Sequence, residues 1–342
     1  MEVPDFNPLK IQKNNPGLWR YSHVLPVDFN DAITLGEGYT PTLYLNIEGR
    51  KVHIKQEQLF PTGSYKDRGA TVLISDAHKN GIKHVVQDSS GNAGCAIAAY
   101  AAKAKISCDI YVPEDTSAAK LAQIQMYGAN LIKVAGNREK TAEMALLAAQ
   151  KSYYASHCYN PLFLEGTKTF AYEICEQLNW KTPDVVVLPA GNGTLLLGAY
   201  IGFKHLHESN VIHKIPKLVA IQAENCAPLY HAWKNKLTHL PDIETQTTLA
   251  EGIAIAKPYN GLHMIDAVNK TKGLFLTVSE EEILTTLKNC CHDGYYIEPT
   301  SAATIAGMIK AYEYIEAETW VSLFSGHGLK STEKMLAILS QY

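Results

Sequence analysis

A lysine stands at the expected start of a helix, in a position suited to covalent chemistry. The segment Pro61-Thr-Gly-Ser-Tyr-Lys66-Asp-Arg-Gly69 follows an expected strand at Val52–Lys55 and opens a helix that runs to about Asn80. The positive end of the helix dipole disfavours an ammonium group there, and burial disfavours it further. Both effects make the amine of Lys66 more available to attack a carbonyl group. The alternative is a solvated side chain beside Asp67, since lysines are usually exposed.

Two further loops lie between an apolar strand and a helix. The loop Ser89-Ser-Gly-Asn-Ala-Gly94 offers hydroxyls and backbone N–H groups that suit a carboxylate. The loop Gly191-Asn-Gly-Thr194 is typical of a phosphate cradle. Taken singly, the first is also explained by ordinary helix capping and the second by a tight turn. The second also resembles a dinucleotide fingerprint, but Leu196 stands where its last glycine belongs.

The elements that must position these loops alternate as in a parallel α/β fold. Ligands of such folds bind at the carboxyl edge of the sheet, where all three loops are expected. The expected strands are Val52–Lys55, Val85–Gln87, Asp109–Val112, Leu131–Val134, Val185–Leu188, Leu218–Gln222 and Trp320–Phe324. The main expected helices are Ser117–Tyr127, Arg138–Ser152, Thr167–Leu178, Ile283–Cys291 and Ser301–Ala317.

Composition narrows the class of protein. The 342 residues suggest two lobes or one large α/β unit, and 46% hydrophobic against 19% charged residues argues against disorder. A net charge of −3 favours neither nucleic acid nor an anionic membrane as a partner. Seven cysteines without a C-x-x-C pair indicate reduced thiols in a cytoplasmic protein. We expect no metal, no secretory signal and no membrane span.

Together, several segments resemble the pyridoxal-phosphate (PLP) enzymes of the tryptophan-synthase-β superfamily, fold type II, and within it the threonine-synthase-like branch. The resemblance covers about Leu35 to Lys330. The segments that carry it are Leu35-Gly-Glu-Gly with Thr40-Pro41, the Lys66 segment, Ser89-Ser-Gly-Asn, Leu249-Ala-Glu-Gly-Ile-Ala-Ile, Glu298-Pro-Thr-Ser-Ala-Ala and Ser325-Gly-His-Gly-Leu-Lys.

This resemblance implies a fold and a domain division. It implies two lobes of open twisted sheets flanked by helices, with PLP in the cleft between the lobes, and a homodimer. Residues 1–34 would form an N-terminal arm, residues 35–330 the catalytic unit and residues 331–342 a C-terminal helix. Within the catalytic unit, a smaller mobile lobe would span about 85–165, and the larger lobe would comprise 35–84 and 166–330.

The resemblance also implies a role for each loop. Lys66 would carry PLP as a Schiff base and then transfer protons, and Asn92 would bind the phenolic oxygen of the cofactor. Ser325 would meet the pyridine nitrogen, and such a neutral hydroxyl would not enforce ring protonation, which favours elimination. The 5′-phosphate would be held by Gly191, Asn192, Gly193 and Thr194. The carboxylate of the substrate would be bound by Ser89, Ser90, Gly91 and Ala93.

The implied activity is elimination or replacement on an amino acid, as in a lyase or synthase of the EC 4.2.3 type that converts O-phosphohomoserine to threonine. Two residues depart from the threonine synthase pattern. Ala93 stands where a threonine is usual, and Phe163 stands where an arginine helps to bind phosphate. Lys168 and Arg138 are candidates to replace that arginine, or Phe163 is simply a packing residue.

The alternatives are an amino-acid dehydratase or ammonia-lyase and a β-replacing synthase such as cysteate synthase. More distant ones are an NAD-dependent oxidoreductase and a non-catalytic ligand sensor. Among individual residues, Glu298 either faces the ring or substrate or complements a helix dipole. His327 either lines the cofactor or stabilises a turn. Cys95 is expected to pack in a core.

Overall fold

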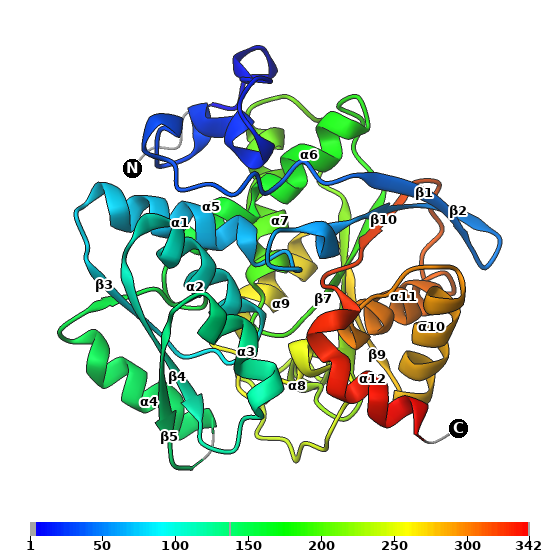
Figure 1. Cartoon of the computed structure of the whole chain (residues 1–342). Helices are drawn as coiled ribbons and strands as arrows, with labels where there is room; N and C mark the ends of the chain where they lie inside the picture. Colours follow the sequence, from blue (N-terminus) through cyan, green and yellow to red (C-terminus); the bar gives the residue numbers. More distant parts are fainter. Residues whose placement is uncertain (1–4, 137, 341–342) are drawn as a thin grey trace. The chain divides into compact units, whose positions relative to one another are not determined.

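The structure is a computed structural model that describes residues 5–136 and 138–340, and its contacts divide the chain into two compact units. The first unit comprises Met1–Tyr39 and Phe60–Thr169, and the second comprises Thr40–Leu59 and Phe170–Tyr342. Each unit has its own sheet with helices packed against it (Figure 1). The expected fold class, α/β with two sheets, is therefore confirmed.

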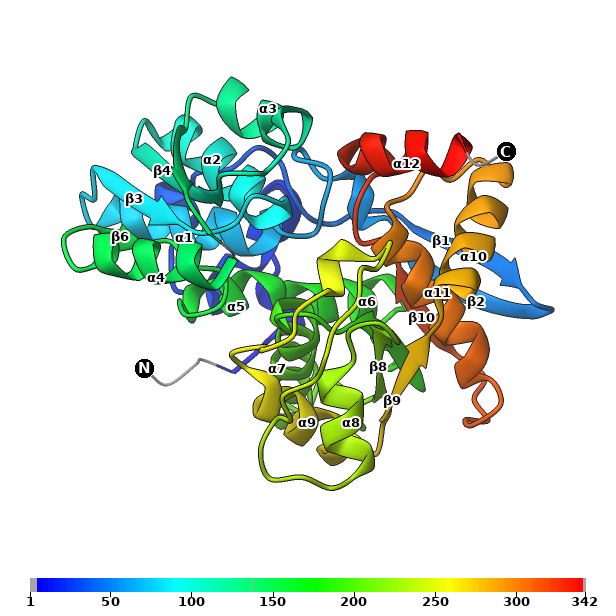
Figure 2. The same ribbon diagram turned by 90° about the horizontal axis from the view of Figure 1, so that it is seen from below.

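The first unit is built on a four-stranded parallel sheet in the order β5-β4-β3-β6. Its strands are β3 (His84–Gln87), β4 (Ser107–Pro113), β5 (Asn130–Val134) and β6 (Tyr153–Tyr154). Its helices are α1 (Asp67–Lys79), α2 (Asn92–Ala104), α3 (Ala118–Met126), α4 (Arg138–Ala149) and α5 (Leu162–Thr167). Helices α2 and α4 pack against β3 and β4 (Figure 2), while α1 packs against α2 and α5.

The second unit is built on a six-stranded sheet in the order β1-β2-β10-β7-β8-β9. Its strands are β1 (Thr42–Ile47), β2 (Arg50–Lys55), β7 (Val185–Pro189), β8 (Lys217–Ala223), β9 (Leu274–Val278) and β10 (Trp320–Leu323). Only β1 is antiparallel to its neighbour. Its helices are α6 (Thr169–Gln177), α7 (Thr194–Glu208), α8 (Pro228–Lys234), α9 (Gly261–Lys270), α10 (Glu280–His292), α11 (Pro299–Ala311) and α12 (Thr332–Leu339).

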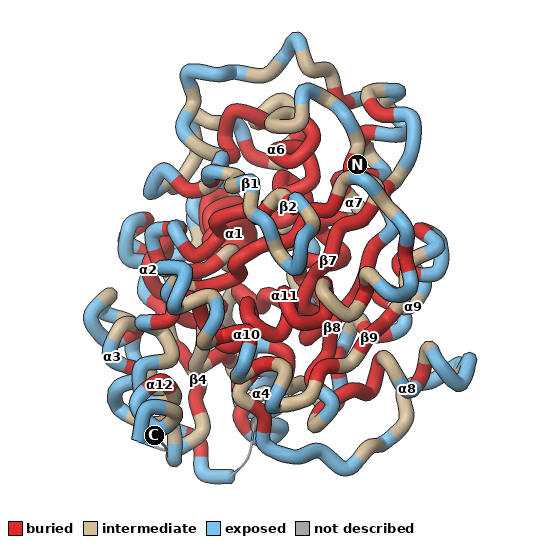
Figure 3. The backbone as a smooth tube through the Cα atoms, turned by 90° about the vertical axis from the view of Figure 1, so that its right-hand side faces the viewer, coloured by how far each residue is buried: buried red, intermediate tan, exposed pale blue. Residues whose placement is uncertain are grey.

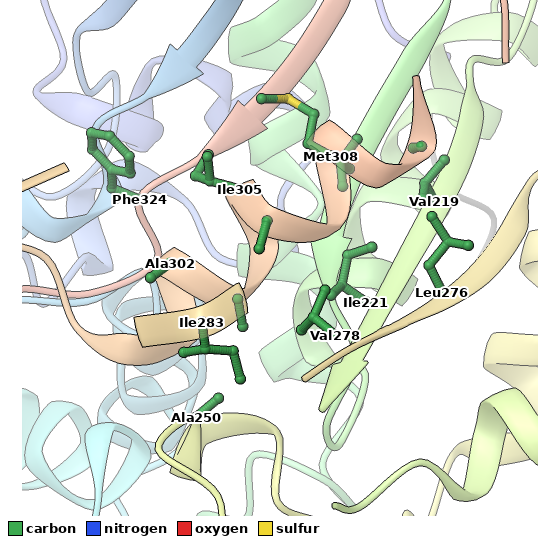
Figure 4. Close-up of a cluster of buried hydrophobic side chains, with 14 of the residues drawn as sticks. Val219, Ile221, Ala250, Leu276, Val278, Ile283, Ala302, Ile305, Met308 and Phe324 are labelled. Carbon is green, nitrogen blue, oxygen red and sulfur yellow. The ribbon is translucent and has the colours of Figure 1, made fainter. Parts of the chain in front are cut away.

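One apolar core of the second unit lies between its sheet and α11. Strand β7 is buried at every position, as expected of a parallel strand covered on both faces (Figure 3). Ile305 and Met308 of α11 join Ile221 of β8 in one apolar cluster (Figure 4). Helix α11 approaches closely because it carries small residues. A Cβ on Gly307 would lie 2.3 Å from Cδ1 of Ile221.

Each sheet has one strand from which the following strands are added on one side, while the last strand of that sheet lies on its other side. In the first unit β3 leads to β4 on one side, while β6 lies on its other side. In the second unit β7 leads to β8 on one side, while β10 lies on the other. Ligands of open α/β sheets bind at such points. The loops that follow β3 and β7 are residues 88–91 and 190–193, which belong to the predicted anion-binding segments.

The N-terminal residues pack on the first unit. Trp19 and Leu18 are buried, and they form a small apolar cluster with Val72 of α1. The contacts place residues 60–84 with the four-stranded sheet, whereas the sequence-based division placed them with the larger lobe. The difference arises because α1 packs on α2 and α5. That residues 85–165 move as one lobe stays a prediction.

Several elements were not expected from the sequence: strands β1, β6 and β9 and helices α5, α8 and α9. Helix α1 begins at Asp67, and the Asp67 carboxylate binds Thr62. Within residues 5–136 and 138–340, no helix is both long and apolar enough to cross a membrane.

Two thiols with raised pKa values predict a loss of folding stability at alkaline pH. Burial and the nearby Asp109 raise the pKa of the Cys108 thiol from 9.0 to about 12. Burial and Cys291 raise the pKa of Cys290 to about 12. The unfolded chain therefore releases protons above pH 9 that the folded chain retains. We expect the free energy of unfolding to be insensitive to these thiols below pH 9 and to fall above it, by up to about 1.4 kcal/mol per pH unit for each thiol.

Urea unfolding at a series of pH values from about 7 to 11 measures this effect. The Cys108→Ala variant should show a shallower decline than the unmodified chain. A Cys290→Ala variant should also show a shallower decline, because its thiol pKa is raised to about 12 as well. Equal slopes for all three proteins would contradict the assignment of the effect to Cys108.

Candidate functional site

Lys66 is the N-cap of α1, one residue before the helical position expected from the sequence. Its side chain is half-buried, and its Nζ contacts the hydroxyl of Tyr65 and lies 3.6 Å from the centre of that ring. No carboxylate pairs with this amine in the part of the chain that the structure describes. Lys66 is thus neither fully solvated nor paired with Asp67, as the alternative interpretation required.

The loop before Lys66 is fixed by side chains rather than by regular structure. The buried carboxylate of Asp67 accepts from the backbone N–H of Thr62 at 2.9 Å and also binds the Thr62 hydroxyl. Gln123 of α3 donates to the Thr62 carbonyl oxygen at 3.3 Å. The hydroxyl of Ser64 is buried and has no hydrogen-bond partner among the described residues. A polar atom of this kind, two residues from Lys66, suits contact with a ligand.

The serine-rich loop connects β3 to α2. Gly91 is the N-cap of α2, so no side chain caps this helix, and its first turn carries no acidic residue. Its turn is tight, because a Cβ on Gly94 would lie 1.8 Å from the Ser89 carbonyl oxygen. The backbone N–H groups at this helix end therefore suit an anion. Ser89 and Ala93 are buried, while Ser90, Gly91 and Asn92 are partly exposed.

Tyr154 of β6 holds the base of this loop. Its hydroxyl donates to Oδ1 of Asp88 at 2.9 Å, one residue before Ser89. Burial and then the Asp88 carboxylate raise the pKa of Tyr154, so this hydroxyl remains a donor well above neutral pH. This contact crosses between adjacent strands at the point where the connections diverge.

Phe163 is a packing residue. It is fully buried in the core of the first unit, on α5. Its ring covers Gly69 of α1, where a Cβ would lie 2.2 Å from Cδ1 of Phe163. Gly166 also approaches α1 closely, because a Cβ added at this position would lie 1.8 Å from the Arg68 carbonyl oxygen. Phe163 therefore sets the spacing of α5 from the helix that begins after Lys66.

The structure describes the side chain of one of the two candidate substitutes for the missing arginine. Lys168 is buried, pairs with Glu165 at 2.5 Å and donates to the Val24 carbonyl oxygen at 3.1 Å. Its amine is thus engaged by these two groups. The side chain of Arg138 lies outside the described residues.

In the second unit, the glycine-rich loop connects β7 to α7. Gly193 is the N-cap of α7 with φ +80°, a left-handed conformation that glycine adopts readily. A Cβ on Gly191 would lie 2.7 Å from the Gly252 carbonyl oxygen. Helix α7 has no side-chain cap and no acidic residue in its first turn, which begins with the buried Thr194. The arrangement fits a phosphate group.

Sequence reasoning missed the residue that secures this loop. Gln222 of β8 is fully buried, and its Nε2 donates to the Ala190 carbonyl oxygen at 3.1 Å. Its Oε1 accepts from the N–H groups of Leu229 and Tyr230, at 2.9 and 3.0 Å. A glutamine inside an otherwise apolar strand was the available signal, because buried polar groups are normally hydrogen-bonded.

We predict that Gln222→Leu weakens binding of a phosphate-bearing ligand about tenfold and lowers stability by about 2–4 kcal/mol, because three backbone groups, two of them buried, lose a partner. Gln222→Glu keeps the acceptor for Leu229 and Tyr230 but loses the donor to Ala190, so it isolates the effect on the loop. Ligand titration and urea unfolding measure the two quantities. Unchanged ligand affinity in both variants would show that Ala190 is held by other contacts.

The loop after β10 is closed by a buried polar cluster. The hydroxyl of Ser325 lies 2.8 Å from Oε1 of Glu298 and 3.1 Å from Oγ of Ser301. Ser301 Oγ also accepts from the N–H groups of Ser325 and Gly326. All three side chains are buried. Glu298 is the N-cap of α11 but does not cap it through its side chain, so it serves Ser325 instead.

Three segments noted in the sequence therefore meet within the second unit. The backbone at Gly252 packs against Gly191 and donates an N–H to Oγ1 of Thr300 at 3.1 Å. His327 accepts from the N–H of Leu329 at 3.2 Å and stacks edge-on with Tyr296, so it stabilises a turn. Cys95, as expected, packs in the core of the first unit.

Comparison with known proteins gives a consistent assignment. Residues 33–326 match the family described as pyridoxal-phosphate dependent enzyme. The chain is 36% identical to the threonine synthase of Methanocaldococcus jannaschii, over 95% of this chain and 83% of that protein. It is 35% identical to the threonine synthase of Mycobacterium tuberculosis, over 92% of this chain and 89% of that protein.

Solved structures agree on the fold. A threonine deaminase from Solanum lycopersicum has a TM-score of 0.76 and 21% identity, covering 99% of this chain and 94% of that one. Serine racemase from Dictyostelium discoideum has a TM-score of 0.71 and 25% identity, covering 84% and 92%. The chain belongs to the threonine synthase family of pyridoxal-phosphate dependent enzymes.

Proposed function

We propose that this chain is a threonine synthase, which converts O-phosphohomoserine and water to threonine and phosphate. The observation that carries this proposal is the set of relatives named threonine synthase, which are 33–36% identical over 92–97% of this chain. Enzymes of this family use PLP as cofactor.

The residues present fit this cofactor. PLP carries a phosphate and an aldehyde. The uncapped N-terminus of α7, with Gly191, Asn192, Gly193 and Thr194, supplies N–H groups for the phosphate. Lys66 supplies a half-buried amine without a carboxylate partner for the aldehyde. Bound PLP provides an electron-accepting ring for reactions at the substrate's Cα.

We assign the remaining roles to the chain's own groups. Lys66 anchors the cofactor and moves the proton at the substrate's Cα. Asn92, the first residue of α2, orients the ring through its phenolic oxygen, and Ser325 meets the ring nitrogen. The substrate carboxylate binds the N-terminus of α2 through Ser89, Ser90, Gly91 and the backbone of Ala93, supported by the absence of any acidic residue in that turn.

Ala93 and Phe163 bear on the substrate. Both have hydrocarbon side chains, so neither side chain offers a polar group to a ligand. The substrate's phosphate must then be bound without an arginine at position 163. We propose that the enzyme binds O-phosphohomoserine with other donors and therefore with a higher KM than a threonine synthase that has this arginine.

We also propose that the enzyme is a cytoplasmic homodimer and that residues 85–165 move as a lobe on substrate binding. The family resemblance supports these points, and all seven cysteines are free thiols. Size-exclusion chromatography with light scattering tests the dimer. Hydrogen exchange with and without substrate tests the lobe.

The decisive experiment uses the purified protein with PLP and a panel of amino acids: O-phosphohomoserine, O-phosphoserine, serine, threonine and 2,3-diaminopropionate. Phosphate, threonine, ammonia and keto acid are measured for each. We expect equal amounts of phosphate and threonine from O-phosphohomoserine. Ammonia and keto acid from serine or threonine as the dominant products would instead show a dehydratase. Binding without any product would show a sensor.

A further inference from the structure

We propose that the second unit carries a second ligand site, which binds an α-amino acid with an anionic side chain. The site is a pocket of about 340 Å³ at the amino edge of the six-stranded sheet. This volume suits a ligand as small as an amino acid. The charged residues that line the pocket are Asp184, Lys214, Lys217, Lys272 and Glu316. The inference does not depend on the proposed function.

The pocket and the glycine-rich loop lie at opposite ends of the same strands. The lining residues begin or closely precede four parallel strands: Asp184 and Val185 at β7, Lys214, Ile215 and Lys217 at β8, Thr271 and Lys272 at β9, and Ile315, Glu316 and Ala317 at β10. The glycine-rich loop follows the carboxyl end of β7, which has five residues. At about 3.3 Å per residue the two edges are roughly 16 Å apart. A ligand in the pocket therefore does not occupy the phosphate loop.

One carboxylate of the pocket is already satisfied. Asp184 pairs with Lys214 at 2.5 Å and accepts from the backbone N–H groups of Glu318 at 3.2 Å and Thr319 at 3.0 Å. These contacts hold the segment between α11 and β10 beside the start of β7. Because the charges of Asp184 and Lys214 cancel, the other charged side chains decide which ligand fits.

Those three side chains are unpaired. Lys217, Lys272 and Glu316 are exposed, and within residues 5–136 and 138–340 none of them forms an ion pair or a side-chain hydrogen bond. Two ammonium groups and one carboxylate thus line one pocket without neutralising one another. A ligand with two anionic groups and one ammonium group complements all three charges. An α-amino acid with a carboxylate or a phosphate on its side chain has this set of groups.

The remaining wall of the pocket suits the carbon chain of such a ligand. Val185 and Ile315 are buried, and Ile215 is partly buried. The hydroxyl of Thr271 is already engaged, because it donates to the Ala267 carbonyl oxygen at 3.0 Å and accepts from a backbone N–H of β8. The pocket therefore combines exposed charges with an apolar floor, as expected of a site for a short charged molecule.

The test is a titration with L-aspartate, followed by NMR through the methyl signals of Ile215 and Ile315. The protein is the holoenzyme after borohydride reduction, so that the amino acid cannot form a covalent adduct with the cofactor. We expect both signals to shift, while the signal of Ile74, in the core of the first unit, stays unchanged. O-Phospho-L-serine, titrated in parallel, shows whether a phosphate or a carboxylate is preferred on the side chain.

The lysines of the pocket should determine the affinity. Lys217→Gln and Lys272→Gln should each weaken binding of L-aspartate about threefold, because each removes one exposed partner of an anionic group. Lys204→Gln is the matched control, since Lys204 is an exposed lysine of α7 outside the pocket. Pocket variants that bind L-aspartate as tightly as this control would overturn the inference.

Glu316→Gln gives the sharpest result, because its effect depends on the ammonium group of the ligand. L-Aspartate should bind about threefold more weakly to this variant, since its ammonium group loses a partner. Succinate lacks that group and should bind more tightly, since a repulsive charge is removed. Affinities for the two ligands that change in the same direction would refute the assigned role of Glu316.

Two further results would overturn the site as a whole. One is that neither L-aspartate nor O-phospho-L-serine shifts the signals of Ile215 and Ile315. The other is that L-valine, which has no charge on its side chain, shifts them at the same concentration as L-aspartate. A protein in which borohydride fixes no PLP to Lys66 would instead contradict the proposed function, and the same titrations on the unreduced protein would still test the pocket.

Discussion

Replacing Lys66 with alanine is expected to abolish the visible absorbance of bound PLP and to lower kcat at least about 10³-fold. The substitution removes the amine that anchors the cofactor and moves the Cα proton. Because Lys66 is half-buried and forms no ion pair among the described residues, its loss should change stability little. Absorbance spectra, borohydride reduction with mass spectrometry, and the threonine assay measure the effect.

Lys79→Ala is the matched control, because Lys79 ends the same helix and forms an exposed ion pair with Asp31 at 3.2 Å. This variant should keep the absorbance and the turnover within a factor of about two. A Lys66→Ala protein that remains yellow and active would refute the assignment of Lys66. Labelling of another lysine by borohydride would identify the correct one.

Replacing Glu37 with alanine is expected to destabilise the first unit by about 4 kcal/mol, the largest effect on stability that we predict. Its carboxylate is almost fully buried and accepts from Trp19 Nε1 at 2.9 Å, the Tyr100 hydroxyl at 2.8 Å and the Leu35 N–H at 2.7 Å. The substitution would remove the acceptor of the buried Tyr100 hydroxyl and leave Trp19 Nε1 with the Thr71 hydroxyl at 3.1 Å. It would also detach the N-terminal segment from α2.

Urea unfolding followed by circular dichroism measures this loss. Glu37→Gln keeps the shape and one acceptor, so it should destabilise by about half as much. Glu143→Ala, an exposed glutamate in the same unit, should change stability by less than about 0.5 kcal/mol. An unfolding midpoint for Glu37→Ala equal to that of Glu143→Ala would show that other acceptors replace the carboxylate.

Much of the site could be predicted because its parts are local in the chain. The segments around Lys66, Asn92 and Gly193 each combine an apolar run, a turn and a helix start within about ten residues. Those patterns placed all three at the carboxyl ends of strands or the first turns of helices. The observed helix boundaries differ from the predicted ones by a few residues. The reason is that a helix end depends on which side chain hydrogen-bonds to the backbone there, as Asp67 does to Thr62.

The rest depends on contacts between distant residues. Ser325 and Glu298 are 27 positions apart and meet only because α11 packs beside β10. Strand β6 has two residues and is recognisable only by its pairing with β3. Strand β9, in contrast, could have been predicted from the sequence, because the apolar run Leu274–Val278 is typical of a buried strand.

The position of β10 in its sheet affects how the chain folds while it is being synthesised. Strand β10 is the last in the sequence but lies between β2 and β7, so the hairpin of residues 42–55 joins the remaining strands only through residues 320–323. During translation, residues up to 169 can complete the four-stranded sheet of the first unit. Until residues 320–323 are synthesised, the hairpin lacks its partner strand along the edge of β2. A polypeptide that stopped before residue 320 would therefore expose two unpaired strand edges to aggregation.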